Sequence, residues 1–133
     1  MARLNTLRKI AAAAALSLAF TVQAADDPSI KGELRKTIHD SMNSFIQQQN
    51  IDGRIYVYDA VAGKLLKLKL DELHSGIVKK GDFYVSCADF RDDNGGKVDI
   101  DFLVRPSGEQ LVTTQALVHS IDGKKRKYHL EKM

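Results

Sequence analysis

FYVSCADFRDDNGGKVDIDFLV, residues 83–104, specifies the architecture of this chain more strongly than any other segment. Its centre holds Asn94 and Gly95, a dipeptide typical of a β-hairpin turn when apolar runs flank it. With a three-residue loop at 93–95, Phe90 lies opposite Val98, and the pairs that follow at every second position are mostly apolar. The segment therefore predicts two antiparallel strands with one apolar and one polar face.

The polar face of this hairpin gathers three carboxylates and one thiol: Asp89, Asp99, Asp101 and Cys87. In the same register Asp89 lies opposite Asp99, and Cys87 lies opposite Asp101. Such a patch can bind a cation or support acid–base chemistry. The simpler interpretation is a solvent-facing network of ion pairs, in which Lys67 and Lys69 of a neighbouring strand neutralise the carboxylates.

One amphipathic helix is expected before the sheet, from about residue 28 to residue 49. Asp27 followed by Pro28 is typical of a helix start. Apolar residues then recur at helical spacing: Ile30, Leu34, Ile38, Met42, Phe45 and Ile46. This stripe needs an apolar surface to cover it.

Beyond the helix the apolar pattern changes to a period of two, which predicts strands. They are expected at 54–58, 66–71, 83–90, 97–104 and 111–119, with a short last strand at 127–130 and an irregular connection at 74–82. The prediction is an α+β fold, with one N-terminal helix packed on a four- to six-stranded antiparallel sheet.

This order of elements resembles the cystatin-like and NTF2-like architectures, in which a helix lies across a curved antiparallel sheet. The resemblance covers most of the chain after residue 24 and implies a fold, not a function. The Gln-x-Val-x-Gly motif of cystatins is absent from the sequence. In composition the chain is also similar to small, uncharacterised exported proteins of bacteria.

Residues 1–24 have the layout of a secretory signal peptide. Arg3, Arg8 and Lys9 precede an uncharged stretch at 10–22, and Ala24 ends a segment suited to signal peptidase. The apolar stretch is shorter than the roughly 20 residues of a membrane-spanning helix. We therefore expect cleavage after Ala24 and export to the periplasm or beyond. The remainder, residues 25–133, is expected to be a single domain without a transmembrane segment.

The net charge of +3 depends on this leader. Without its three basic residues, 17 Lys and Arg face 17 Asp and Glu, so nucleic acid is not an expected partner. The densest basic run is Lys124, Lys125, Arg126 and Lys127. It is most simply a solvated hairpin tip or tail, and the alternative is weak contact with an anionic surface.

Cys87 is the single cysteine, so an internal disulfide is impossible. Within a strand it is most simply a small packed side chain. The alternatives are a nucleophile paired with His74, His119 or His129, or a disulfide linking two chains, so a monomer and a Cys87-linked dimer both remain open. The fourth histidine, His39, is expected to be solvated, and His119 with His129 forms a two-histidine metal site only if the last strand pairs back.

These observations favour an exported, non-catalytic binding or accessory module for an unknown protein or small molecule. Tyr56, Tyr58 and Tyr84 are candidates to line one contact surface, and no cofactor is expected. A second hypothesis is a metal-dependent or thiol enzyme that uses the Asp89, Asp99, Asp101 and Cys87 face. A third is an interaction module that adds a strand of a partner to its sheet edge.

Overall fold

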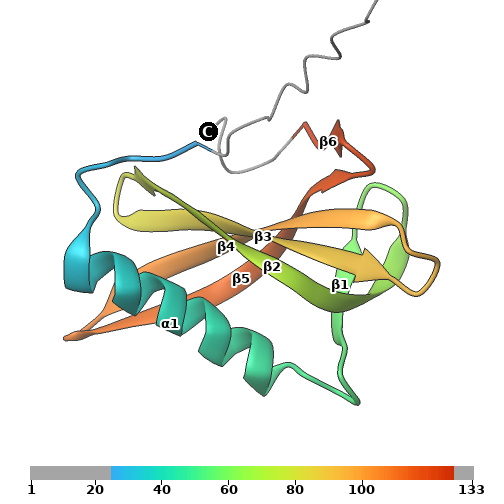
Figure 1. The fold of residues 1–133 in the computed structure, drawn as a ribbon, viewed down its shortest axis with the longest axis horizontal. Coiled ribbons are helices and arrows are strands. Elements are labelled where there is room, and N and C mark those ends of the chain that lie inside the picture. Colours follow the sequence, from blue (N-terminus) through green and yellow to red (C-terminus); the bar gives the residue numbers. More distant parts are fainter. Residues whose placement is uncertain (1–24, 128–133) are drawn as a thin grey trace, which may run out of the picture.

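The computed structural model describes residues 25–127, and the expected signal peptide at 1–24 lies outside this range. Across the described residues the helix α1 (Gly32–Gln48) precedes a meander of antiparallel strands, each paired with the next (Figure 1). These are β1 (Ile55–Asp59), β2 (Lys64–Lys80), β3 (Phe83–Asp92), β4 (Lys97–Ser107), β5 (Gln110–Ile121) and β6 (Lys124–Lys125). The α+β class and the antiparallel sheet are thus confirmed.

The hairpin of β3 and β4 has the predicted register. Phe90 pairs with Val98, Asp89 with Asp99, and Cys87 with Asp101. The Asp92 N–H donates to the Gly96 carbonyl at 3.0 Å, which closes the loop. Gly95 has a φ of +80°, a conformation that glycine adopts without steric cost.

The helix starts later than expected, at Gly32, and it is internal to the chain rather than N-terminal. Asp27 caps a turn instead of the helix, because its carboxylate accepts hydrogen bonds from the Ser29 N–H at 3.0 Å and the Ser29 hydroxyl at 2.7 Å. Gly32 has a φ of +61°, so the backbone becomes helical only after it. The preceding segment is tied to the sheet by the Asp27 N–H, which donates to the Ile77 carbonyl at 2.7 Å.

The expected connection at 74–82 is wrong in most of its length. β2 continues to Lys80, and a tight turn then leads directly into Phe83. The register of β2 against β3 shifts twice, between Leu70 and Glu72 and between Leu73 and Ile77. These irregularities interrupt the period of two at residues 74–76, which explains why the pattern there indicated a loop.

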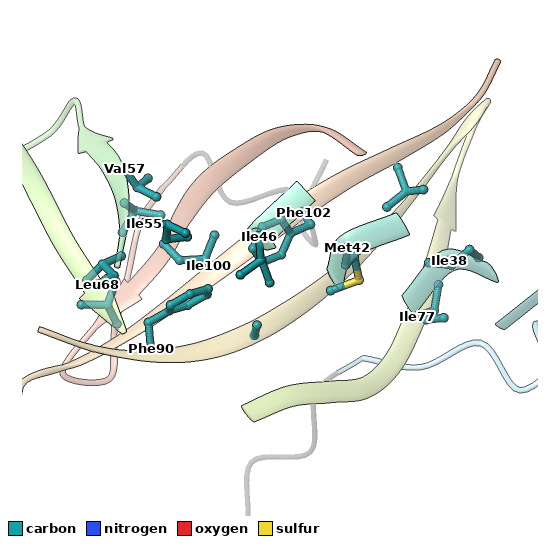
Figure 2. Close-up of a cluster of buried hydrophobic side chains, with 14 of the residues drawn as sticks. Ile38, Met42, Ile46, Ile55, Val57, Leu68, Ile77, Phe90, Ile100 and Phe102 are labelled. Atoms are coloured by element: carbon teal, nitrogen blue, oxygen red, sulfur yellow. The ribbon is translucent and has the colours of Figure 1, made fainter. Parts of the chain in front are cut away.

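The core lies between α1 and the facing side of the sheet (Figure 2). Ile38, Met42 and Ile46 of the helix are buried. They share one cluster with strand side chains that include Phe90, Ile100 and Phe102, and the close-up places Ile77 at the Ile38 end of this cluster. The rings of Phe45 and Phe102 pack edge to face with centroids 5.9 Å apart. The sheet therefore covers the apolar stripe of the helix, as expected.

A buried ion pair links the first strand to the segment after the last one. Asp59 ends β1 and is fully buried, and Arg126 Nη2 donates to its Oδ2 at 2.5 Å. The other Asp59 oxygen accepts from the Val61 N–H at 3.1 Å. The Arg126 N–H also donates to the His119 carbonyl at 2.7 Å. Arg126 therefore joins β1 to β5, although the two strands lie far apart in the sequence.

The described residues include no helix with the length and apolar character needed to span a bilayer.

Candidate functional site

The side of the sheet that faces away from α1 carries a group of titratable side chains, here called the polar cluster. Side chains alternate between the two faces of a strand, so the odd-numbered residues of β3 and β4 point away from the core. The cluster comprises His74, Cys87, Asp89, Asp99, Asp101 and His119. They belong to the four consecutive strands β2 to β5.

The most buried part of the cluster is centred on the Asp101 carboxylate. Asp101 is fully buried, and Cys87 and His119 are each 3% exposed. The Cys87 thiol donates to Asp101 Oδ1 at 2.8 Å, and His119 Nδ1 lies 2.9 Å from the same oxygen. Both contacts are shorter than ordinary van der Waals separations, so the three side chains form one hydrogen-bonded unit.

The less buried part of the cluster contains His74, Asp89 and Asp99. His74 Nε2 lies 3.0 Å from Asp89 Oδ1, an ion-pair distance without the angles of a hydrogen bond. Lys97 Nζ lies 3.5 Å from Asp89 Oδ2. The other ring nitrogen, His74 Nδ1, and Asp99 Oδ1 are both buried without a hydrogen-bond partner.

Asp99 has the largest electrostatic perturbation in this part. Burial raises the pKa of its carboxyl from 3.8 to about 6. The charges of His74 and His119 lower the pKa, and those of Asp89 and Asp101 raise it further. A buried carboxyl without sufficient compensating charge is a frequent property of functional sites.

Two sets of three side chains in the cluster have the proximity that a metal ion requires. The first trio is His74, Cys87 and Asp99, and the second is Cys87, Asp101 and His119. Within each trio the candidate ligand atoms all lie within 4.8 Å of one another. Each trio offers a sulfur, an imidazole nitrogen and a carboxylate oxygen, which are the ligand types of Zn²⁺ and related ions.

The sequence predicted that the four side chains of the hairpin would share a face, and they do. His74 and His119 were named only as alternative partners of Cys87, and the sequence did not show that both join the carboxylates, because each is placed by an irregularity in a strand. His74 lies in the irregular part of β2. On β5, Asp99 pairs with Ser120 and Ile100 with Val118, so His119 is the extra residue of a bulge. A bulge leaves no regular signal in the sequence pattern.

The expectation of a solvent-facing ion-pair network is wrong for the centre of the cluster. Cys87 and Asp101 are buried. The expected neutralising lysine Lys67 instead lies with its Nζ 3.4 Å from Asp93 Oδ2, outside the cluster.

Thiol catalysis has little support in this geometry. A nucleophilic cysteine needs access to a substrate and a base that removes its proton. Cys87 is buried, and its thiol donates to a carboxylate. The same burial means that a Cys87-linked dimer would require the sheet to open.

The other predicted contact residues are dispersed over the molecule. Lys124, Lys125 and Lys127 are exposed, whereas the Arg126 side chain is only 17% exposed and pairs with Asp59. The basic run is therefore not a uniformly solvated tail. His129 and most of the expected strand at 127–130 lie outside the described residues.

The three tyrosines do not share one surface. Tyr56 and Tyr58 are exposed on β1, whereas Tyr84 packs against the core on the helix side. His39 is not solvated as expected, because its Nε2 atom is buried, and this burial lowers the pKa of the ring. A groove of about 310 Å³ opens between β1 and β5, with Phe45, Tyr56 and Ala116 in its lining. It contains no residue of the polar cluster.

Comparison of the chain with protein-family models, curated proteins and solved structures returned no match.

Proposed function

We propose that this chain is an exported binding module whose ligand is a divalent transition-metal ion held by the polar cluster. One observation carries the proposal: a thiol, imidazoles and carboxylates approach within 4.8 Å in two overlapping trios. The signal-peptide pattern of residues 1–24 supports export.

The mixture of ligand types favours a transition metal over Ca²⁺ or Mg²⁺. The two alkaline-earth ions prefer oxygen ligands and bind poorly to sulfur. Cys87 and a histidine occur in both trios, which suits Zn²⁺, Co²⁺, Ni²⁺ and copper. Ligand atoms around a tetrahedral Zn²⁺ lie about 3.3–3.8 Å apart, so a trio needs to shift by only roughly 1 Å to hold the ion.

Electrostatics also supports a cation at this site. Ionised carboxylates are costly to bury unless a positive charge compensates them. Asp101 is fully buried, and one oxygen of Asp99 is buried without a hydrogen-bond partner. A divalent ion would add positive charge beside both carboxylates, and its binding would release the thiol proton of Cys87 to solvent.

Thermal unfolding with added metal tests this proposal. An ion that binds the native state at 100 times its Kd stabilises it by about 2.7 kcal/mol. For a domain of this size that corresponds to a rise in Tm of roughly 10 °C. We expect such a rise with Zn²⁺ and Co²⁺, and little change with Mg²⁺ or Ca²⁺.

A matched pair of variants distinguishes metal binding at the polar cluster from metal binding at other carboxylates. Cys87→Ser should abolish the Zn²⁺ effect, because both trios contain this sulfur. Asp71→Asn should retain it, because Asp71 is an exposed carboxylate that pairs with Arg91 outside the cluster. An unchanged Tm of the unmodified protein with every transition metal tested would refute the proposal.

A further inference from the structure

We infer that the polar cluster holds two metal ions that share the Cys87 sulfur as a bridging ligand. This inference rests on the proposed metal-binding function and extends it to the number of ions and the assignment of their ligands. The first ion would take His74, Asp99 and Cys87. The second would take Asp101, His119 and Cys87.

The separation of the trios is the first argument. The two trios have only the Cys87 sulfur in common, and their five ligand atoms do not form one group within 4.8 Å. Two ligands of a single zinc-like ion lie at most about 4.6 Å apart, because each bond is no longer than roughly 2.3 Å. One ion therefore cannot use all five side chains without a rearrangement of the sheet.

The matched composition of the trios is the second argument. Each trio supplies one imidazole and one carboxylate besides the shared sulfur. The two imidazoles lie on opposite sides of Cys87 in the strand order, since His74 belongs to β2 and His119 to β5, whereas both carboxylates belong to β4. A thiolate sulfur has more than one lone pair, so it can bind two ions at the same time.

The contacts of His74 are the third argument. Its Nε2 lies 3.0 Å from Asp89 Oδ1, which leaves Nδ1 as the atom available to a metal. That Nδ1 atom is buried and has no hydrogen-bond partner, and the same holds for Asp99 Oδ1. A carboxylate behind the second ring nitrogen is the usual support of a metal-bound histidine. Asp89 would thus orient His74 without touching the ion.

The net charge of the polar cluster also favours two ions over one. A single ion in the Asp101 trio would leave Asp99 and His74 without a cation. With Cys87 ionised, the cluster carries four negative charges, from the thiolate and from Asp89, Asp99 and Asp101. Lys97 Nζ lies 3.5 Å from Asp89 Oδ2 and compensates that carboxylate, so three negative charges remain on the ligands, more than one divalent ion can balance. Both binding steps together release one proton, that of the Cys87 thiol, and involve no change of oxidation state.

Metal stoichiometry tests the inference. The protein would be loaded with Co²⁺, freed of excess ion, and analysed by native mass spectrometry together with elemental analysis. We expect two ions per chain and a thiolate-to-cobalt charge-transfer band in the near ultraviolet. Asp99→Asn and His74→Gln should each reduce the count to one and retain the band. Cys87→Ser should abolish the band, and Asp71→Asn should leave both the count and the band unchanged.

The number of bound ions distinguishes two-ion binding from one-ion binding and from the absence of metal binding. One ion in the unmodified protein, whether or not Asp99→Asn removes it, would overturn the two-ion inference and leave the metal-binding function standing. No bound ion would overturn both. His74 and Asp99 are only partly buried, so their variants are expected to fold, and circular dichroism of each variant verifies this. A magnetic interaction between two Co²⁺ ions, detected by electron paramagnetic resonance, would independently support the sulfur bridge.

Discussion

At the scale of single residues, the most informative feature is the difference in hydrogen bonding between two carboxylates on β4, Asp99 and Asp101. Asp101 is fully buried but accepts hydrogen bonds, whereas Asp99 has a buried oxygen without a partner. Burial is the largest influence on the Asp99 pKa and raises it to about 6. The protonated form of Asp99 is therefore favoured in the native state over a wider pH range than in the unfolded chain.

Asp99→Asn is expected to stabilise the metal-free protein more at pH 7.5 than at pH 4.5. In the unfolded chain Asp99 loses its proton near pH 3.8, but in the native state only near pH 6. The native state thus binds more protons between these values, so the free energy of unfolding falls as the pH rises through this window and stays lower above it. The effect is at most about 3 kcal/mol and is smaller if solvent screens the carboxylate.

Denaturant unfolding in the presence of a chelator, at both pH values, measures this difference. An equal effect of Asp99→Asn at pH 4.5 and pH 7.5 would contradict a raised pKa for Asp99 in the native state.

At the scale of elements, α1 and the β3–β4 hairpin were predictable to different degrees. The hairpin register followed from two independent signals, the Asn94-Gly95 loop and the apolar alternation, which agree. The start of α1 was misplaced because Asp27 and Pro28 also suit a turn. The register shifts in β2 and β5 that bring His74 and His119 to the cluster depend on how the strands pair. The spacing of apolar residues in the sequence carries no information on this pairing.

The packing of α1 predicts a contrast between two residues of the same apolar stripe. Met42 is fully buried, whereas Leu34 is 39% exposed. Met42→Ala should lower the free energy of unfolding by about 2–5 kcal/mol, because it leaves a cavity against the sheet. Leu34→Ala should cost less than roughly 1 kcal/mol. Chemical denaturation of both variants measures the contrast, and equal losses would show that α1 is seated differently on the sheet.

At the scale of the whole molecule, the ion pair of Asp59 and Arg126 connects parts of the chain that are 67 residues apart. The sequence placed Arg126 in a basic run, because nothing local distinguishes it from the adjacent lysines. Only the folded sheet brings the end of β1 beside this residue. The same limitation applied to the cluster: the shared face of the hairpin carboxylates was predictable, whereas the sequence left open which of His74, His119 and His129 lies beside them.

Arg126→Ala is expected to destabilise the protein by about 3 kcal/mol, because it leaves the buried Asp59 carboxylate without its cation. Lys125→Ala should change the stability by less than about 0.5 kcal/mol, since Lys125 is exposed. The double variant Asp59→Asn with Arg126→Ala should recover part of the loss, because no buried charge remains. A thermodynamic cycle from urea unfolding of the single and double variants measures the coupling energy between Asp59 and Arg126. Strictly additive losses would show that the two side chains do not stabilise each other.

The opposite faces of β3 and β4 have a consequence for how the chain avoids errors as it folds. Even-numbered residues such as Phe90 and Phe102 enter the core, and odd-numbered ones such as Asp89 and Asp101 enter the cluster. A slip of either strand by one residue would exchange these sets, burying carboxylates among aliphatic side chains and exposing phenyl rings to water. The acidic residues therefore disfavour misaligned pairings of the two strands, because such pairings would bury their charges.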